Sequence, residues 1–353
     1  MPLALLAAAS PEVAAWAGAG RPPGPRGGPA TTARRYRTSA EILADDDGAA
    51  AMAPPPATGA GPRAPSPTSS LTRLPWLDED DAADCAFREH WEWQLGFFAG
   101  RLANARPREP ERDDVADLHY AVREDATGRG RPSARVYTVS LESDEYRDVR
   151  MTYMHCPAME ALRCVAYPRD GDLPCLGMGV MKMAGTRHLS IMDYQPLPPT
   201  NAAGEAINDR YRRELTAIRR AIPSMSQPMS RRTFDSDEDR KYFTAEPLLG
   251  RCDEASATPA AAAAYRRDLR RAQEAFVARH VALTRACAAE GRGEARGGDS
   301  ARARARHAAF DAHLAAHEPA APFLKGVFGE EVGRRLVRDV IFPLADAGDG
   351  EGR

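Results

Sequence analysis

The sequence lacks the long hydrophobic runs that membrane-spanning helices need. No uninterrupted apolar run reaches the ~18 residues required to cross a bilayer. Six cysteines occur, none in a Cys-x-x-Cys pair and none at zinc or iron–sulfur spacing, so we expect ordinary reduced thiols, mostly buried. The net charge of −2 excludes a globally basic nucleic-acid-binding protein.

Motifs for phosphate and metal binding are also missing. Gly177-Met178-Gly179 lacks a third glycine at the required place, and no Gly-x-x-x-x-Gly-Lys-Ser/Thr occurs. We therefore expect no dedicated nicotinamide, flavin or nucleotide site. His313 and His317 lie four residues apart, but no third ligand follows at a recognisable spacing, so we expect solvated histidines and no metal site.

Residues 1–70 differ in composition from the rest of the 353-residue chain. They are dominated by Ala, Gly, Pro, Ser and Thr with scattered arginines, and they offer little material for a core. We expect a disordered targeting segment, since this composition is typical of plastid or mitochondrial import, although the acidic run at 45–47 departs from it. The alternative is a low-complexity tail that carries no targeting signal. A folded domain is expected at 71–345, followed by a tail at 346–353.

Hydrophobic periodicity divides the folded part into strands between helices. A stripe of apolar residues at spacings of three and four predicts a helix at 81–105. The expected strands are 134–141, 149–156, 160–167, 175–183 and 188–194. Most links between them are too short for helical crossovers, which predicts antiparallel pairing. The expected later helices are 205–221, 260–290, 301–317 and 323–340.

Strands flanked by helices at both ends predict an α+β domain. Both parities of the strands are apolar, as at Met159, Leu162, Val165 and Tyr167, so both faces of the sheet should be covered. These features predict a three-layer α/β/α sandwich with a central, largely antiparallel sheet.

Two blocks of sequence resemble the ferredoxin-dependent bilin reductases, which reduce linear tetrapyrroles of the biliverdin type. The first is Leu-Pro-x-x-Gly at 173–177, with a hairpin ending in Asp-Tyr-Gln-Pro-Leu at 193–197. The second is Glu-Pro-Ala-Ala-Pro-Phe-Leu-Lys-Gly-Val-Phe-Gly-Glu-Glu at 318–331, followed by Ile-Phe at 341–342. The resemblance covers about 76–344. It implies an α/β/α sandwich and an oxidoreductase that takes single electrons from reduced ferredoxin onto bound bilin, without a permanently bound cofactor.

Glu318 aligns with the acidic residue that this family places before a proline, and the resemblance implies that it donates a proton. Arg163 lies at a position expected to face the bilin. From the residues alone it could bind a propionate or carbonyl oxygen, or form a structural ion pair with a carboxylate such as Asp193. Gly179 stands where the family commonly carries a catalytic acid or Asn. Another residue or water must then supply that proton, or regiospecificity has changed, or activity has been lost.

Four more residues are candidates for substrate binding. Arg231 and Arg251 could clamp propionates, because carboxylates favour bidentate arginine. Met181 and His188 belong to the central hairpin and are expected to contact the bilin.

Two clusters of arginine could dock ferredoxin, because ferredoxins are strongly acidic. Arg266 and Arg270 lie on one side of an expected helix, and they are our candidate partner-binding residues. A second basic helix carries Arg212, Arg213, Arg219 and Arg220. A merely solvated face is the alternative for both.

The hairpin most resembles the branch of the family that reduces 15,16-dihydrobiliverdin to phycoerythrobilin. We therefore expect that reaction in the plastid stroma after import, with ferredoxin as donor and an upstream bilin enzyme as a further partner for substrate channelling. Two alternatives stay open. One is another regiospecificity, yielding phycocyanobilin, phytochromobilin or phycourobilin. The other is a bilin-binding carrier or regulator without reductase activity.

Overall fold

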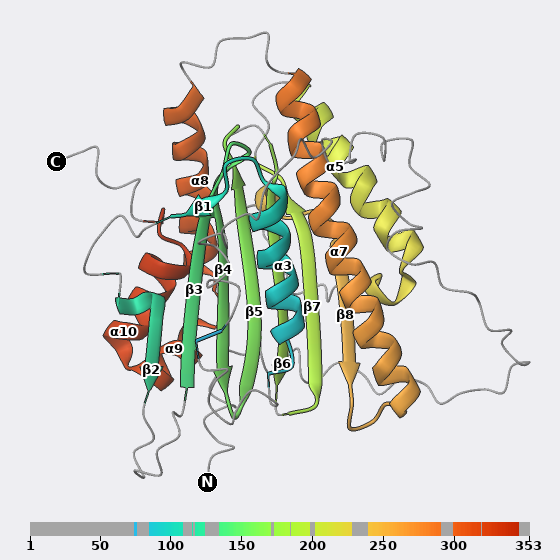
Figure 1. Cartoon of the computed structure of the whole chain (residues 1–353), viewed down its shortest axis with the longest axis vertical. Coiled ribbons are helices and arrows are strands. Elements are labelled where there is room, and N and C mark those ends of the chain that lie inside the picture. The colour runs from blue at the N-terminus through green and yellow to red at the C-terminus, as the bar shows by residue number, and fades with distance from the viewer. Residues whose placement is uncertain are drawn as a thin grey trace, which may run out of the picture.

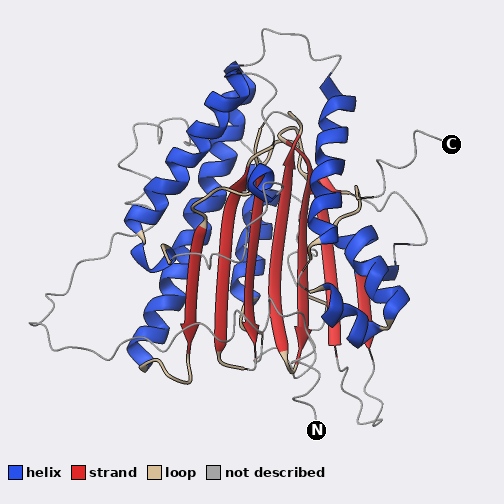
Figure 2. Ribbon diagram, turned by 180° about the vertical axis from the view of Figure 1, so that it is seen from behind, coloured by secondary structure: helices blue, strands red, loops and turns tan. Residues whose placement is uncertain are grey.

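The computed structural model describes residues 74–75, 85–108, 115, 117–123, 134–170, 173–183, 185–197, 202–227, 239–290, 299–318 and 320–345. Within these ranges the chain forms one eight-stranded sheet with helices on both faces (Figures 1 and 2). The expected targeting segment and the expected C-terminal tail lie outside the described residues. No helix in the described ranges is long and apolar enough to cross a membrane.

The strands form a sheet in the order β1-β3-β4-β5-β6-β7-β8, and β2 also pairs with β3. Their bounds are β1 Arg106–Pro107, β2 Tyr120–Arg123, β3 Ala134–Glu142, β4 Tyr146–Cys156, β5 Met159–Pro168, β6 Cys175–Met183, β7 Arg187–Gln195 and β8 Leu248–Asp253. Every pairing is antiparallel. The five predicted strands are confirmed. The prediction missed β1, β2 and β8, which are too short to show a clear apolar pattern.

One helical layer consists of α3 Arg88–Arg101, α5 Ala202–Ala221 and α7 Pro259–Glu290. These helices lie side by side across one face of the sheet (Figure 1). Their apolar stripes bury Trp91, Phe98 and Phe276 against Met151 and Tyr194 of the strands. Burying each of these large side chains stabilises the fold by about 1.5–3 kcal/mol.

The second layer contains α8 Asp299–Ala316, α9 Ala321–Phe328, α10 Glu330–Arg335 and a π-helical turn, η7, Leu336–Ile341. Its core packs Phe310, Leu336 and Phe342 against Val165 and Tyr167 of β5. The α/β/α sandwich is therefore confirmed. Figure 2 shows these helices over the β2 side of the sheet, and no long helix of the described chain covers this face of β6, β7 and β8.

The last predicted helix, 323–340, is not continuous. It breaks at Gly329, whose φ of 90° lies in the region that favours glycine. Across the break α10 packs closely on α9, because a Cβ added at Gly333 would lie 2.5 Å from the Cα of Lys325. The remaining short elements are η4 Asp117–His119, η5 Pro223–Met225 and α6 Asp239–Tyr242.

Candidate functional site

Arg163 and Glu318 meet on the α8 side of the sheet. Arg163 lies in β5, and Glu318 follows the last turn of α8. The Arg163 Nη1 donates a hydrogen bond to Glu318 Oε2, and the two side chains form an ion pair. The other carboxylate oxygen, Oε1, accepts a hydrogen bond of 3.0 Å from the backbone N of Ala320. The Arg163 guanidinium also lies 4.4 Å from the centroid of the Phe342 ring, which adds a cation–π contact.

The partner of Arg163 differs from the structural alternative that the sequence suggested. Asp193 accepts hydrogen bonds from the backbone N and the Oγ1 of Thr244, at 2.8 and 2.5 Å. Burial raises the pKa of Asp193 to about 6. Asp193 therefore joins β7 to the segment after α6, and Glu318 is the carboxylate that meets Arg163.

Gly179 lies directly beside Arg163, because the two are register partners in β6 and β5. A Cβ added at Gly179 would meet only Ile191 Cγ2, at 3.6 Å, so close packing does not require glycine here. Gly177 is different, because a Cβ there would lie 2.1 Å from the side-chain Oε1 of Gln195. Gly179 thus leaves room for a small side chain, in ordinary contact with Ile191, next to the ion pair.

Met181 lies on the same face as Gly179, two residues further along β6, and it packs against the core under the C-terminal helices. Arg251 also lies on this face, since it pairs in register with Leu189 of β7, which pairs in turn with Met181. The structure therefore gathers Arg163, Gly179, Met181 and Glu318 together, with Arg251 at the β8 edge. Arg231 lies outside the described residues.

His188 points to the opposite face of the sheet. Its ring lies near Phe87 and Tyr265, with centroid distances of 6.1 and 5.9 Å, and its Nε2 lies 3.4 Å from an oxygen of Glu254. Burial lowers the pKa of His188. The structure does not bring this histidine together with Arg163 and Glu318.

The model of the family described as ferredoxin-dependent bilin reductase matches residues 116–343. The chain belongs to this family. Its fold agrees with that assignment, because the chain is similar to tomato phytochromobilin synthase, solved in complex with biliverdin, with a TM-score of 0.54 and 14% identity. That similarity covers 76% of this chain and 85% of the tomato chain.

Two curated relatives are each named 15,16-dihydrobiliverdin:ferredoxin oxidoreductase. The one from Nostoc punctiforme is 26% identical over 127 residues, which is 35% of this chain and 49% of the relative. The one from Gloeobacter violaceus is 26% identical over 140 residues, which is 39% of this chain and 53% of the relative. The chain thus spans about half the length of the curated relatives it matches.

In this bilin reductase family member, the two arginines expected to dock ferredoxin lie on α7, in the other helical layer. Arg266 pairs with Glu254. Arg270 pairs with Glu274 at 2.6 Å and lies 5.0 Å from the ring centroid of Trp93. Acids of the chain itself therefore already balance both charges.

Sequence reasoning missed several polar residues on the face that carries Arg163. Thr138 and Thr152 share a hydrogen bond of 2.9 Å, and Thr152 is a register partner of Arg163. Gln195 is buried, and its Oε1 has no hydrogen-bond partner in the described chain. The only signal for Gln195 was its place in the Asp-Tyr-Gln-Pro-Leu block, and the threonines had none.

His313 in α8 and His317, which directly follows this helix, do not belong to a metal-binding group among the described residues. No group of three or more His, Cys, Asp or Glu in the described part of the chain could hold a metal ion. The prediction that both histidines are solvated is wrong for His313, which is buried, with its ring centroid 4.8 Å from that of Tyr242. His317, which follows the end of α8, is exposed, and its Nδ1 lies 2.8 Å from the carbonyl oxygen of His313.

Proposed function

We propose that this chain reduces 15,16-dihydrobiliverdin to phycoerythrobilin with electrons from ferredoxin. The observation that carries the proposal is the Arg163–Glu318 ion pair beside Gly179, a position without a side chain. Arg163 lies in β5 and Gly179 in β6, and no long described helix covers this face of β6 and β7 (Figure 2). The family and the names of the two relatives support the substrate class.

The bilin lies, in this proposal, against Gly179 and Met181, with Arg163 at its polar edge. Glycine lets a flat tetrapyrrole approach the backbone closely, and Met181 offers an adaptable apolar contact. Arg163 has a binding role in this proposal, because the planar set of N–H donors on its guanidinium matches a propionate carboxylate or a lactam oxygen.

The reaction adds two electrons and two protons to the bilin, and the electrons come singly from ferredoxin. Glu318 is the proposed source of one proton. In the structure it is an ion-paired carboxylate, and a carboxylate must first be protonated before it can act as an acid. If Arg163 turns to a substrate carboxylate on binding, the ion pair opens and the Glu318 carboxyl group becomes available to the bilin.

Gly179 has no side chain that could donate a proton, so in this scheme the residue at this position of the sheet does not protonate the bilin. The second proton comes from water in our proposal. A different product, such as phycocyanobilin, phytochromobilin or phycourobilin, would follow if water reaches another carbon of the bilin.

A non-catalytic bilin carrier is the second candidate, and one observation favours it. Among the described residues of the candidate site, Glu318 is the only carboxylate; it is already paired with Arg163, and Gly179 adds no second acid. A carrier needs the binding face but not a free acid.

The test incubates the full chain without oxygen with a ferredoxin-reducing system and, separately, biliverdin and 15,16-dihydrobiliverdin. Absorption spectra are followed and the products are separated by chromatography. We expect turnover of dihydrobiliverdin to phycoerythrobilin. Turnover of biliverdin alone would replace the proposed substrate, and tight binding without turnover of either bilin would favour the carrier.

Glu318→Gln separates the two candidates further. In an enzyme this variant should bind bilin but stall or accumulate a one-electron-reduced radical, which electron paramagnetic resonance detects. In a carrier it should only shift the spectrum of bound bilin. Glu331→Gln is the matched control, because Glu331 is exposed and pairs with Arg334 away from Arg163.

We also propose that the chain works in the plastid stroma, that residues 1–70 direct its import, and that an upstream bilin enzyme hands it substrate. The composition of residues 1–70 supports the import part. A fluorescent protein fused behind residues 1–70 should enter plastids, whereas diffuse cytosolic fluorescence would contradict plastid import.

A further inference from the structure

Arginines from four segments gather at one end of the sheet, on the side of α8. Arg147 lies in β4, Arg169 follows β5, Arg108 follows β1, and Arg304 lies in α8. Burial, with the positive charges of Arg304, Arg169 and Arg108, lowers the pKa of Arg147. We call these four residues the arginine cluster.

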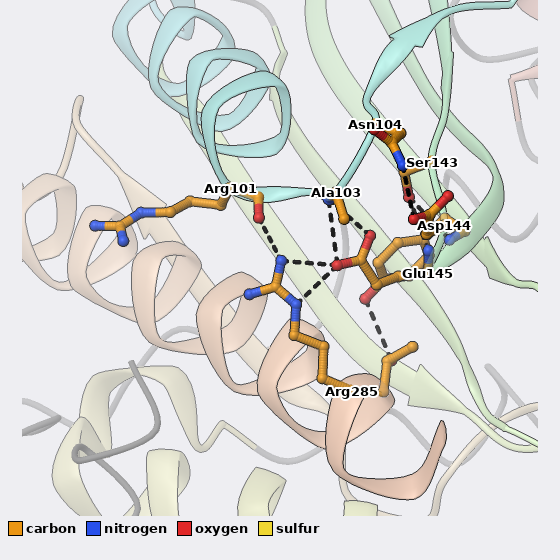
Figure 3. Close-up of polar contacts among 9 residues, drawn as sticks. Arg101, Ala103, Asn104, Ser143, Asp144, Glu145 and Arg285 are labelled. Carbon is orange, nitrogen blue, oxygen red and sulfur yellow. Dashed lines mark hydrogen bonds and ion pairs between the residues drawn. The ribbon is translucent and has the colours of Figure 1, made fainter. Parts of the chain in front are cut away.

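The two acids that shortly precede Arg147 in the sequence, Asp144 and Glu145, bind other residues (Figure 3). Asp144 accepts a hydrogen bond of 2.9 Å from Asn104. Glu145 pairs with Arg285 of α7 at 2.7 Å and accepts a bond of 3.0 Å from the backbone N of Ala103. This network fixes the turn between β3 and β4, so Arg147 is presented from a rigid support.

Two of the four arginines in the cluster pair with a carboxylate, and the other two pair with none among the described residues. Asp148 is shared between Arg150 and Arg108, and Glu142 between Arg106 and Arg169. In the described part of the chain no carboxylate pairs with Arg147 or Arg304, and the buried Nη1 of Arg147 has no hydrogen-bond partner.

His307, in the same part of α8, cannot relieve this imbalance. It is fully buried, and neither ring nitrogen has a hydrogen-bond partner among the described residues. Burial lowers its pKa to about 3, with the positive charges of Arg147 and Arg306 adding to the effect. The histidine therefore stays neutral, and Arg147 and Arg304 have no carboxylate partner among the described residues.

We propose that the arginine cluster is the surface on which this chain docks its acidic electron donor, ferredoxin. The inference rests on the proposed function. A partly desolvated guanidinium without a carboxylate gains charge-assisted hydrogen bonds when a partner brings one. A positive patch on a protein of net charge −2 also orients an acidic partner before contact.

The location suits electron delivery to the candidate site. Arg169 lies six residues beyond Arg163 on the path of β5, which is about 20 Å at ~3.3 Å per residue. A standard interface buries ~800 Å² per partner, equivalent to a disc of ~16 Å radius, so a partner centred on the cluster reaches most of the way to Arg163. Arg266 and Arg270 lie in the opposite layer, behind the sheet, and are paired with Glu254 and Glu274.

The experiment measures binding of ferredoxin to the full chain at several salt concentrations, without bilin. Arg304→Glu and the double variant Arg169→Glu/Arg304→Glu are compared with Arg88→Glu. Arg88 is the control, because it lies on α3, in the other layer, with 40% of its side chain exposed, and the charge change per residue is the same. We expect the double variant to raise the Kd at least tenfold and to flatten its salt dependence, and Arg88→Glu to change the Kd less than twofold.

Several outcomes would overturn the docking proposal. The first is an unchanged Kd and salt dependence in the double variant. The second is a larger loss of ferredoxin affinity in Arg266→Glu/Arg270→Glu than in the double variant. The third is binding of inorganic phosphate at the cluster without any effect on ferredoxin binding. Arg304→Ala keeps the test valid if charge reversal prevents folding. Bilin spectra of the same variants separate the docking proposal from the proposed function. Normal bilin turnover with unaltered ferredoxin affinity in the variants rejects only the docking surface. Absence of bilin binding in the unmodified chain rejects the proposed function.

Discussion

Arg163 and Glu318 lie 155 residues apart in the sequence and form an ion pair across the interface between the sheet and the C-terminal helical layer. The side chain of Glu318 is 6% exposed and that of Arg163 is 23% exposed, so water screens the pair only partly. The pair thus connects β5 to the end of α8. It also brings together a cation that can bind a carboxylate and a carboxyl group that can carry a proton.

Removing one member of this pair should cost stability. Glu318→Gln leaves the Arg163 charge half-buried without its partner, and we expect the free energy of unfolding to fall by about 1–3 kcal/mol. Urea unfolding measures this, and Arg163→Met with the double variant completes a thermodynamic cycle. The exposed Glu331→Gln should change stability by less than ~0.5 kcal/mol. Additive effects of the two single substitutions would show that the pair contributes nothing.

Gly179 and Gly177 should respond differently to a side chain. Gly179→Asp should fold with stability within about 1 kcal/mol of the unmodified chain, because its Cβ would make only an ordinary contact with Ile191 and glycine within a strand is itself unfavourable. Its carboxylate would compete with Glu318 for Arg163, so we expect a changed ratio of bilin products. Gly177→Ala should lose about 1–3 kcal/mol, because the buried Gln195 amide must move. Equal losses at both positions would contradict this account.

The close contact of α9 and α10 gives a second pair of matched glycines. Gly333→Ala places a Cβ against the backbone of Lys325, which cannot move aside cheaply, so we expect a loss of about 1–3 kcal/mol. Gly326→Ala meets nothing within 4 Å and should be neutral or stabilising by up to ~1 kcal/mol. Thermal unfolding of the two variants checks the order, and a more stable Gly333→Ala would refute the packing.

Asp311 should make stability depend on pH. It accepts hydrogen bonds from the Tyr167 hydroxyl and from the backbone N of Leu344, and burial raises its pKa to about 7 despite the nearby Arg150. Its ordinary pKa in the unfolded chain is about 4, so between pH ~4 and ~7 the folded chain binds more protons. The contribution of Asp311 to the unfolding free energy therefore falls as pH rises through that window.

Asp311→Asn removes this fall, and the difference in stability between the two proteins should change by a few kcal/mol, on the order of 1.4 per unit of pKa shift, between pH 4 and 8. His280 and His307, whose pKa values burial lowers to about 3, act in the opposite direction, but they are common to both proteins and cancel. Urea unfolding across this range makes the comparison. Parallel pH curves would show that Asp311 does not titrate in the folded chain.

Local patterns predicted most of the elements but not their interruptions. The central strands and the long helices follow from runs and spacings of apolar residues within a single segment. The break at Gly329 was not predicted, because the apolar periodicity continues across it and only the positive φ of one glycine divides α9 from α10. Strand β8 escaped it too, since six residues containing a glycine show no clear period.

The candidate site was predicted residue by residue, not as an arrangement. Arg163, Gly179 and Glu318 were each identified by resemblance, yet Asp193 was the carboxylate suggested for Arg163. His188 was expected beside the bilin, but it belongs to the register row of Lys182 and Cys252, on the other face of the sheet. Both parities of β7 are apolar, so alternation alone could not assign His188 to a face.

The sequence by itself determined the family, the succession of helices and strands, and the antiparallel sheet, because these depend on local composition, short links and contiguous motifs. Only the tertiary structure decided that Glu318 meets Arg163 and that Arg266 and Arg270 are already paired, whereas Arg147 and Arg304 have no carboxylate partner among the described residues. Such pairings join residues up to 155 positions apart. They arise when two helical layers bury opposite faces of one sheet, and no local pattern records which charges that burial brings into contact.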